Sequence, residues 1–199
     1  MIEGIIAATS SLDEALATES RALVQTATPE AYRQYLARLF GFIAPLERSL
    51  AKFPDLRSAV DTRRFDKHEL LRRDLEALNT RASELVCCSE IPIFNDVQTA
   101  LGWAYVMERS SLGHTALFQA LASLMPREAA FAASYVKCYF GAIGESWRNF
   151  VEALDAAATS ELETTRIIAA AQDASSAYVA WSRVPLHALV HRAAIRLVR

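Results

Sequence analysis

The residues best placed for chemistry lie in the middle of the most apolar helical stretch, 97–124. The sequence there runs Glu108-Arg109-Ser110-Ser111-Leu112-Gly113-His114, so charged, hydroxyl and imidazole side chains follow one another inside a segment expected to be buried. Buried polar groups need partners, because an unpaired one costs free energy. This stretch is therefore the first candidate for a functional site.

The other histidines favour plainer interpretations. His68 lies in the charged run Asp66-Lys67-His68-Glu69, which is typical of a solvated surface. His187 and His191 have the i, i+4 spacing of a metal-chelating pair, but no third ligand follows at an obvious spacing and arginines surround them. A solvated basic face is the preferred interpretation, and the sequence predicts no metal site.

Acids and cysteines give no enzyme signature. The paired acids Asp13-Glu14 and 161–163 have no second catalytic group placed beside them, and neither a phosphate-binding glycine loop nor a GxSxG elbow is present. Cys87, Cys88 and Cys138 are an odd number without CxxC spacing, which fits a reducing cytoplasm. A redox pair at the adjacent Cys87 and Cys88 is the alternative.

Composition predicts one domain over residues 1–199. A chain of 199 residues with 52% hydrophobic and 22% charged residues can bury a full core. Its net charge of −2 gives no general attraction to nucleic acid or anionic membranes. No stretch approaches 18 uncharged apolar residues, and no basic segment precedes an apolar run at the N-terminus, so we expect a cytoplasmic protein without a membrane span.

Helical periodicity with short turn signals runs nearly end to end and predicts an all-α, compact helical bundle. Thr28-Pro29-Glu30 is typical of a helix start, Pro45 should bend or end that helix, and Asn95 or Asp96 should cap the one at 97–124. The segment 87–95 should be a loop because Pro92 cannot continue a helix. The remaining expected helices cover 10–25, 66–78 and 161–181.

The C-terminal segment predicts a separate, basic amphipathic helix at about 184–199, starting at Pro185. Its leucines, valines and arginines share one short stretch without an acid. Exposed apolar side chains need cover. Three occupants are open for this helix: a protein partner, an acidic surface, or a second copy of the chain in a homodimer.

Four segments together resemble the heme oxygenases, in particular the small bacterial biliverdin-forming enzymes associated with phytochromes. The most specific is ALGWAYVMERSSLGH at 100–114, which is similar to that family's distal-helix pattern ALGALYVLEGSTLGG. The supporting segments are 70–75, 139–141 and 147–150. The resemblance spans about residues 5–181 and implies a heme oxygenase-like fold.

The resemblance implies a heme site between a proximal helix with an axial histidine and a distal helix with close-approaching glycines. The proximal motif has the histidine four positions after a threonine, but Asp13 stands four positions after Thr9, and no histidine precedes His68. Carboxylate is not among the usual axial ligands of heme. The resemblance therefore places an aspartate where the iron ligand would be.

The distal side departs from the family pattern too. Of its three glycines only Gly113 remains, the first being Arg109, and these two positions share one helix face. A long cation there should obstruct heme. The former heme site would comprise Asp13, Arg109, Ser110, Gly113 and His114. We expect Arg109 to cross it and pair with Asp13; the alternative is that both side chains turn to solvent.

These departures predict a degenerate heme oxygenase, a pseudoenzyme that serves as a regulatory or protein-interaction module in signalling and needs no cofactor. The alternative is an active heme oxygenase, or a heme or bilin binder, in which Asp13, water or His114 replaces the axial histidine and heme is degraded to biliverdin, iron and carbon monoxide. The distal helix should also be irregular from Ser110 to Gly113, because serines bond back to the preceding turn and glycine is a weak helix former.

Overall fold

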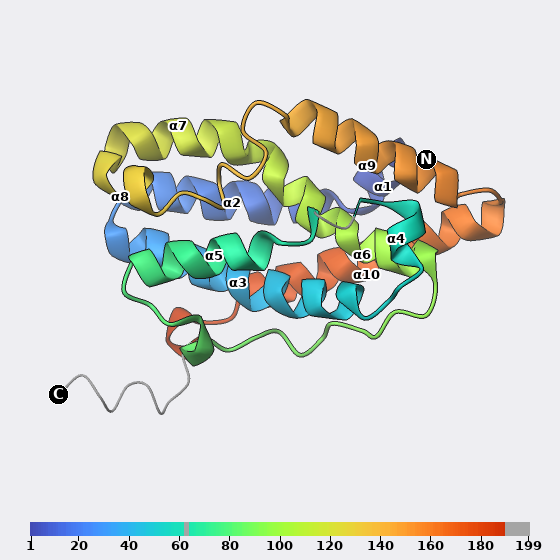
Figure 1. The fold of residues 1–199 in the computed structure, drawn as a ribbon, viewed down its shortest axis with the longest axis horizontal. Coiled ribbons are helices and arrows are strands. Elements are labelled where there is room, and N and C mark those ends of the chain that lie inside the picture. Colours follow the sequence, from blue (N-terminus) through green and yellow to red (C-terminus); the bar gives the residue numbers. More distant parts are fainter. Residues whose placement is uncertain (62–63, 190–199) are drawn as a thin grey trace.

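The computed structural model describes residues 1–61 and 64–189, and its regular elements are helices (Figure 1). This confirms the all-α fold class. Ten are α-helices within the described part of the chain: α1 (Ile2–Ala8), α2 (Ser10–Thr26), α3 (Pro29–Ala51), α4 (Leu56–Ala59), α5 (Lys67–Ala77), α6 (Val97–Ser110), α7 (His114–Leu124), α8 (Pro126–Phe131), α9 (Ile143–Ala157) and α10 (Glu161–Ser182). The short 3-10 helices are η2 (Ala82–Glu84), η3 (Ser111–Gly113) and η4 (Leu186–Ala188).

Local capping fixes where the long helices begin. The Thr28 hydroxyl accepts a hydrogen bond from the Ala31 amide at 3.2 Å, directly before Pro29 in the first turn of α3. The Asp96 carboxylate accepts one from the Thr99 amide at 2.8 Å and starts α6. These side chains satisfy amides that have no partner within the helix. Both predicted helix starts are confirmed.

The core forms where α6 packs along α10 and the other helices surround this pair. Close approach requires Gly102 of α6, because a Cβ atom there would lie 2.6 Å from the Ala170 Cβ and 2.7 Å from the Ile167 carbonyl oxygen. In Figure 1, α7 runs along the top of the molecule, α2 lies below it, and α3 and α5 lie lower still. The chain thus places α2 beside the α6–η3–α7 element.

Two details differ from the sequence predictions. Helix α1 was not predicted, and of the two outcomes expected at Pro45 the helix end does not occur, because α3 continues to Ala51. Residues 126–157 form α8, an irregular segment and α9. That irregular segment is held by Asp74 of α5, whose carboxylate accepts hydrogen bonds from the Ser134 and Tyr135 amides, each at 2.8 Å.

The C-terminal segment turns back onto the bundle after α10. Helix η4 follows Pro185, Leu189 is 2% exposed, and its carbonyl oxygen accepts a hydrogen bond from the Val86 amide at 2.9 Å. The rest of the predicted helix at 184–199 lies outside the described residues. None of the described helices is long and apolar enough to cross a membrane.

Candidate functional site

The polar cluster in the most apolar stretch interrupts that helix. Helix α6 ends at Ser110, η3 follows, and α7 starts at His114, which confirms the predicted irregularity. Ser110 donates its hydroxyl to the Met107 carbonyl and Ser111 donates to that of Glu108, each at 2.8 Å. Hydroxyls that bond to the preceding turn compete with the helix ladder there.

Asp13 of α2 and Arg109 of α6 form a two-pronged ion pair across the two helices. The distance from Arg109 Nε to Asp13 Oδ1 is 2.8 Å, and that from Nη2 to Oδ2 is also 2.8 Å. This planar arrangement is the strongest geometry available to a guanidinium and a carboxylate. The predicted pairing is confirmed, and the alternative in which both side chains turn to solvent is wrong.

Aromatic and hydroxyl groups surround this pair. The Arg109 guanidinium lies 5.8 Å from the centre of the Trp147 ring, which is 5.9 Å from the ring of Tyr105. Thr9, one turn before Asp13, donates its hydroxyl to the Tyr105 oxygen at 3.3 Å. The hydrogen bonds that Arg109 donates to Asp13 raise the pKa of Arg109, so the guanidinium stays charged. Tyr105 and Trp147 are members of this site that sequence reasoning missed, whereas Thr9 was named there only as the threonine of the proximal motif.

Gly113 lies on the exposed side of the element. A Cβ atom added there would meet no described atom within 4 Å. The packing of the described residues therefore does not require glycine at this position. Helix α7 packs directly against α2 nearby, so the two helices that would flank a ligand are in contact.

Glu108 faces the opposite way from its neighbour Arg109 and is 2% exposed. Its Oε1 lies 2.7 Å from the Nζ atom of Lys67, and its Oε2 lies 3.5 Å from Arg64. The Tyr139 hydroxyl donates to Glu108 at 3.2 Å. Burial alone would lower the pKa of Lys67. The interactions with Glu108 and Tyr139 together outweigh this effect, so the pKa is raised. Sequence reasoning missed this cluster, because Lys67 lies in a run typical of a surface.

His114 belongs to that buried face. It is 2% exposed, its ring meets Tyr135 edge-on at 4.7 Å, and its Nδ1 lies 3.8 Å from the Cys138 sulfur. Burial lowers the pKa of His114 to about 3, so the imidazole is neutral. Its Nε2 has no hydrogen-bond partner among the described residues. The structure thus places His114 with Tyr135 and Cys138 and away from the Asp13–Arg109 pair.

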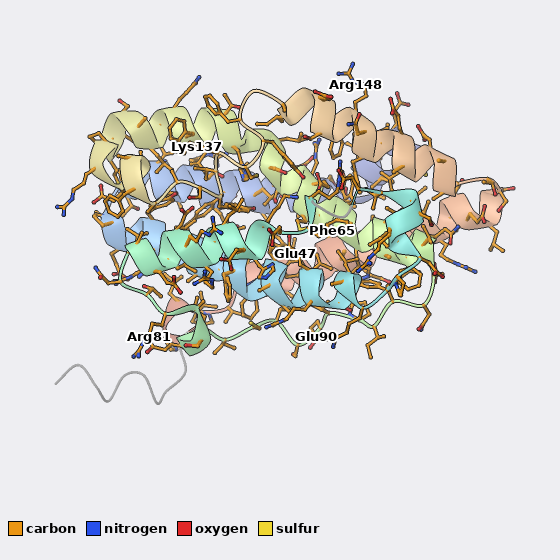
Figure 2. The ribbon with its side chains drawn as sticks, in the orientation of Figure 1. Glu47, Phe65, Arg81, Glu90, Lys137 and Arg148 are labelled. Carbon is orange, nitrogen blue, oxygen red and sulfur yellow. The ribbon has the colours of Figure 1, made fainter. Side chains whose placement is uncertain are left out.

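The His68 side chain is 36% exposed, as expected of a surface residue, but its Nδ1 lies 2.5 Å from the Glu47 carboxylate, so it is not solvated on all sides. The Glu47 carboxylate also accepts the Lys67 and His68 amides, each at 2.9 Å, and thereby caps α5 from α3. In Figure 2, Glu47 lies in the interior, whereas Arg148 lies at the periphery. The hydrogen bond to Glu47 raises the pKa of His68. His187 is exposed, and its predicted companion His191 lies outside the described residues.

A comparison with known families matches most of the chain. A sequence model of the family named heme oxygenase matches residues 11–184, which include both sides of the candidate site. No curated protein matches the chain. Since the match covers most of the 199 residues, the chain belongs to the heme oxygenase family.

Proposed function

We propose that this protein is a degenerate heme oxygenase, which keeps the family fold but neither holds nor cleaves heme. It would act in the cytoplasm as a regulatory or protein-interaction module. The observation that carries the proposal is the two-pronged pair between Asp13 and Arg109, which joins α2 to α6.

The residues present do not fit heme. By family resemblance, Asp13 stands where a histidine would bind the iron, and both of its carboxylate oxygens are engaged by Arg109. Heme proteins use imidazole, thiolate, thioether or phenolate at this position. Heme would have to release the guanidinium and then accept a carboxylate in place of imidazole.

The distal side adds a second obstacle. Glycines let a helix backbone approach a flat ring closely, whereas Arg109 extends a long cation toward α2 and over Trp147. Only Gly113 of the distal glycines remains. The two replacements carry opposite charges, lie on facing helices and are joined to one another. This favours a closed site rather than a site that is open to heme.

A second candidate function is heme or bilin binding with a substitute ligand. One observation favours it: His114 is neutral at physiological pH and its Nε2 has no partner among the described residues. Neutral imidazole is the form that binds iron. Against it stands the position of the ring, which is 2% exposed and packed on Tyr135.

A titration of the purified protein with hemin tests the two candidates. We expect no sharp Soret band at micromolar hemin and no bilin spectrum after addition of a reductant. Stoichiometric binding followed by conversion to bilin would overturn the proposal. If a Soret band forms and is lost in His114→Phe but kept in His187→Phe, the second candidate is correct.

The interaction role depends on the C-terminal segment, whose sequence at 184–199 combines apolar and basic residues without an acid. A protein partner or a second copy of this chain would cover them. Affinity capture from the native cell, combined with measurement of the native mass, distinguishes the two. A monomer that captures no partner would contradict this role, and so would a partner that is still captured when 190–199 is deleted.

A further inference from the structure

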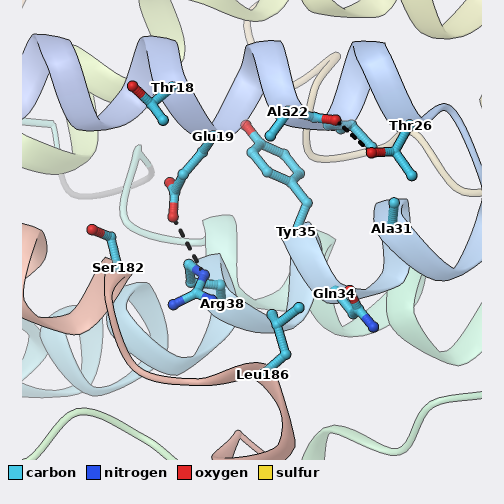
Figure 3. A pocket seen from close by; sticks show the side chains of 11 residues that line it. Thr18, Glu19, Ala22, Thr26, Ala31, Gln34, Tyr35, Arg38, Ser182 and Leu186 are labelled. Atoms are coloured by element: carbon cyan, nitrogen blue, oxygen red, sulfur yellow. Dashed lines mark hydrogen bonds and ion pairs between the residues drawn. The ribbon is translucent and has the colours of Figure 1, made fainter.

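The cavity between α2, α3 and the segment after α10 is crossed by polar contacts between its own residues. Glu19 Oε1 lies 3.4 Å from Arg38 Nε, and Thr26 donates to the Ala22 carbonyl at 2.9 Å (Figure 3). These polar groups are engaged with one another, so they offer little to a ligand. A smaller cavity at the end of α3 has the opposite character.

The smaller cavity lies where α3 meets α4. In Figure 1, α4 lies close to the C-terminal end of α3, and in Figure 2 Phe65 lies between α4 and α5. The volume of the cavity is about 160 Å³, and its lining residues are Leu50, Ala51, Phe53, Arg57 and Phe65. An apolar cavity of about 150 Å³ is large enough to bind benzene. The space is therefore sufficient for one small ring.

The walls of this cavity are mostly hydrocarbon. Leu50 is 1% exposed, and the half-buried rings of Phe53 and Phe65 pack against the core. Helix α3 ends at Ala51, whose methyl group fills little volume. Ala51 and Arg57 are exposed, so they mark the opening of the cavity, whereas the leucine and the two rings form its inner part.

Water inside such a cavity has few hydrogen-bond partners. Four of the five lining side chains are apolar, whereas a water molecule that is held well makes about two to four hydrogen bonds. An apolar group that displaces poorly held water gains affinity. The inner part of the cavity therefore favours a ring or a compact hydrocarbon group.

Arg57 supplies the charge at the opening. It lies in the last turn of α4 and is exposed, so its guanidinium is open to a ligand. No acid among the described residues lines the cavity, Asp55 of the same turn included, and within this part of the chain Arg57 forms no ion pair. The exposed Arg81, by contrast, is paired with Glu84. Because a guanidinium donates two parallel hydrogen bonds to a carboxylate, a carboxylate complements this opening.

We propose that this cavity binds a small monocarboxylate anion whose apolar body is about the size of a benzene ring. The apolar body lies against Phe53 and Phe65, and the carboxylate accepts hydrogen bonds from Arg57. The site belongs to α3, α4 and the chain before α5, none of which contributes to the Asp13–Arg109 pair. Binding here is therefore independent of heme and of that pair.

Four probes separate the contribution of the ring from that of the charge: benzoate, benzamide, protonated benzylamine and acetate. Each is titrated near neutral pH into the ¹⁵N-labelled full chain, and amide shifts are followed by NMR. An exposed ion pair changes affinity by up to about fivefold. We therefore expect benzoate to bind about fivefold more tightly than benzamide and more tightly still than benzylamine. Benzoate should shift amides at 50–57 and at Phe65, and acetate, which has no ring, should give no saturable shift.

Matched variants at exposed positions locate the site, and the amide spectrum of each variant shows whether it is folded. Ala51→Leu fills the cavity and should abolish benzoate binding, while Ala17→Leu on α2 should leave it unchanged. Arg57→Gln should remove the preference for benzoate over benzamide, and Arg148→Gln on α9 should keep it. Benzoate binding that survives Ala51→Leu, equal binding of benzoate and benzamide, acetate binding as tight as that of benzoate, or no saturable shift in the unaltered chain would overturn the proposal.

Discussion

Two neighbouring residues of α6, Glu108 and Arg109, lie in opposite environments. Glu108 is 1% exposed at its side chain and pairs with Lys67, which is 2% exposed. Arg109 is 22% exposed and pairs with Asp13, which is 39% exposed. On one face of the α6–η3–α7 element the ion pair is therefore buried in the core. On the other face the ion pair to α2 is partly exposed to solvent.

The difference decides what a substitution costs on each face. A buried charge whose partner is removed remains uncompensated in a poorly polarisable interior, whereas a partly exposed charge is still solvated. The Asp13–Arg109 face can therefore change with little loss of fold stability. This agrees with the proposal that the site is altered while the core is kept.

The largest expected effect is at Lys67. Lys67→Met leaves the buried Glu108 carboxylate without its closest cation, so we expect a loss of about 3–5 kcal/mol in the free energy of unfolding, measured with urea. Adding Glu108→Leu should recover part of that loss, because no carboxylate is then left buried, although Arg64 loses its partner. A single variant within about 1 kcal/mol of the parent would show that the pair is solvated after all.

The second-largest expected effect is the pH dependence of the free energy of unfolding that His114 causes. The folded pKa of about 3 lies below the ordinary value of 6.5, so between these pH values the unfolded chain binds a proton that the folded chain does not. This contribution to stability is present above pH 6.5 and is lost as the pH falls, with a slope approaching about 1.4 kcal/mol per pH unit.

His114→Phe removes this pH dependence, and the exposed His187→Phe should retain it. The measurement is the free energy of unfolding from urea titrations at several pH values between 4 and 7. Equal slopes for the parent and His114→Phe would mean that His114 is solvated in the folded chain, and the contrast between the two faces would fail.

The smallest expected effect is at Asp13. Asp13→Asn keeps the size of the side chain but weakens the pair with Arg109, and we expect a loss of about 1 kcal/mol or less, because both groups are partly exposed. Glu14→Gln serves as the control on the same helix. A loss as large as that of Lys67→Met would place Asp13 in the core rather than on an open bridge.

The Asp13–Arg109 pair could be predicted from the sequence, but the Lys67–Glu108 pair could not. Family resemblance places Asp13 and Arg109 on facing helices, and opposite charges on facing helices attract. Lys67 lies among charged neighbours, a pattern typical of solvent, and its burial follows from the packing of α5 on α3. Tertiary packing of this kind leaves no local signal.

The helix boundaries also divide into those that the sequence predicts and those that tertiary contacts determine. The starts of α3 and α6 depend on side chains next to the helix, Thr28 and Asp96, so the sequence predicts them. The irregular segment after α8 depends on Asp74, sixty residues earlier in the chain, whose carboxylate binds the Ser134 amide. Long-range hydrogen bonds therefore set the features that the sequence did not reveal.

The central claim is that the Asp13–Arg109 pair closes the site in which the family holds heme. The most direct test is hemin binding, followed by the Soret band, in Asp13→His, Arg109→Gly and the double variant. We expect the double variant to gain stoichiometric binding, with each single variant well below it, because one change supplies the axial ligand and the other clears the ring face. Hemin spectra of the double variant that match those of the parent would contradict the claim.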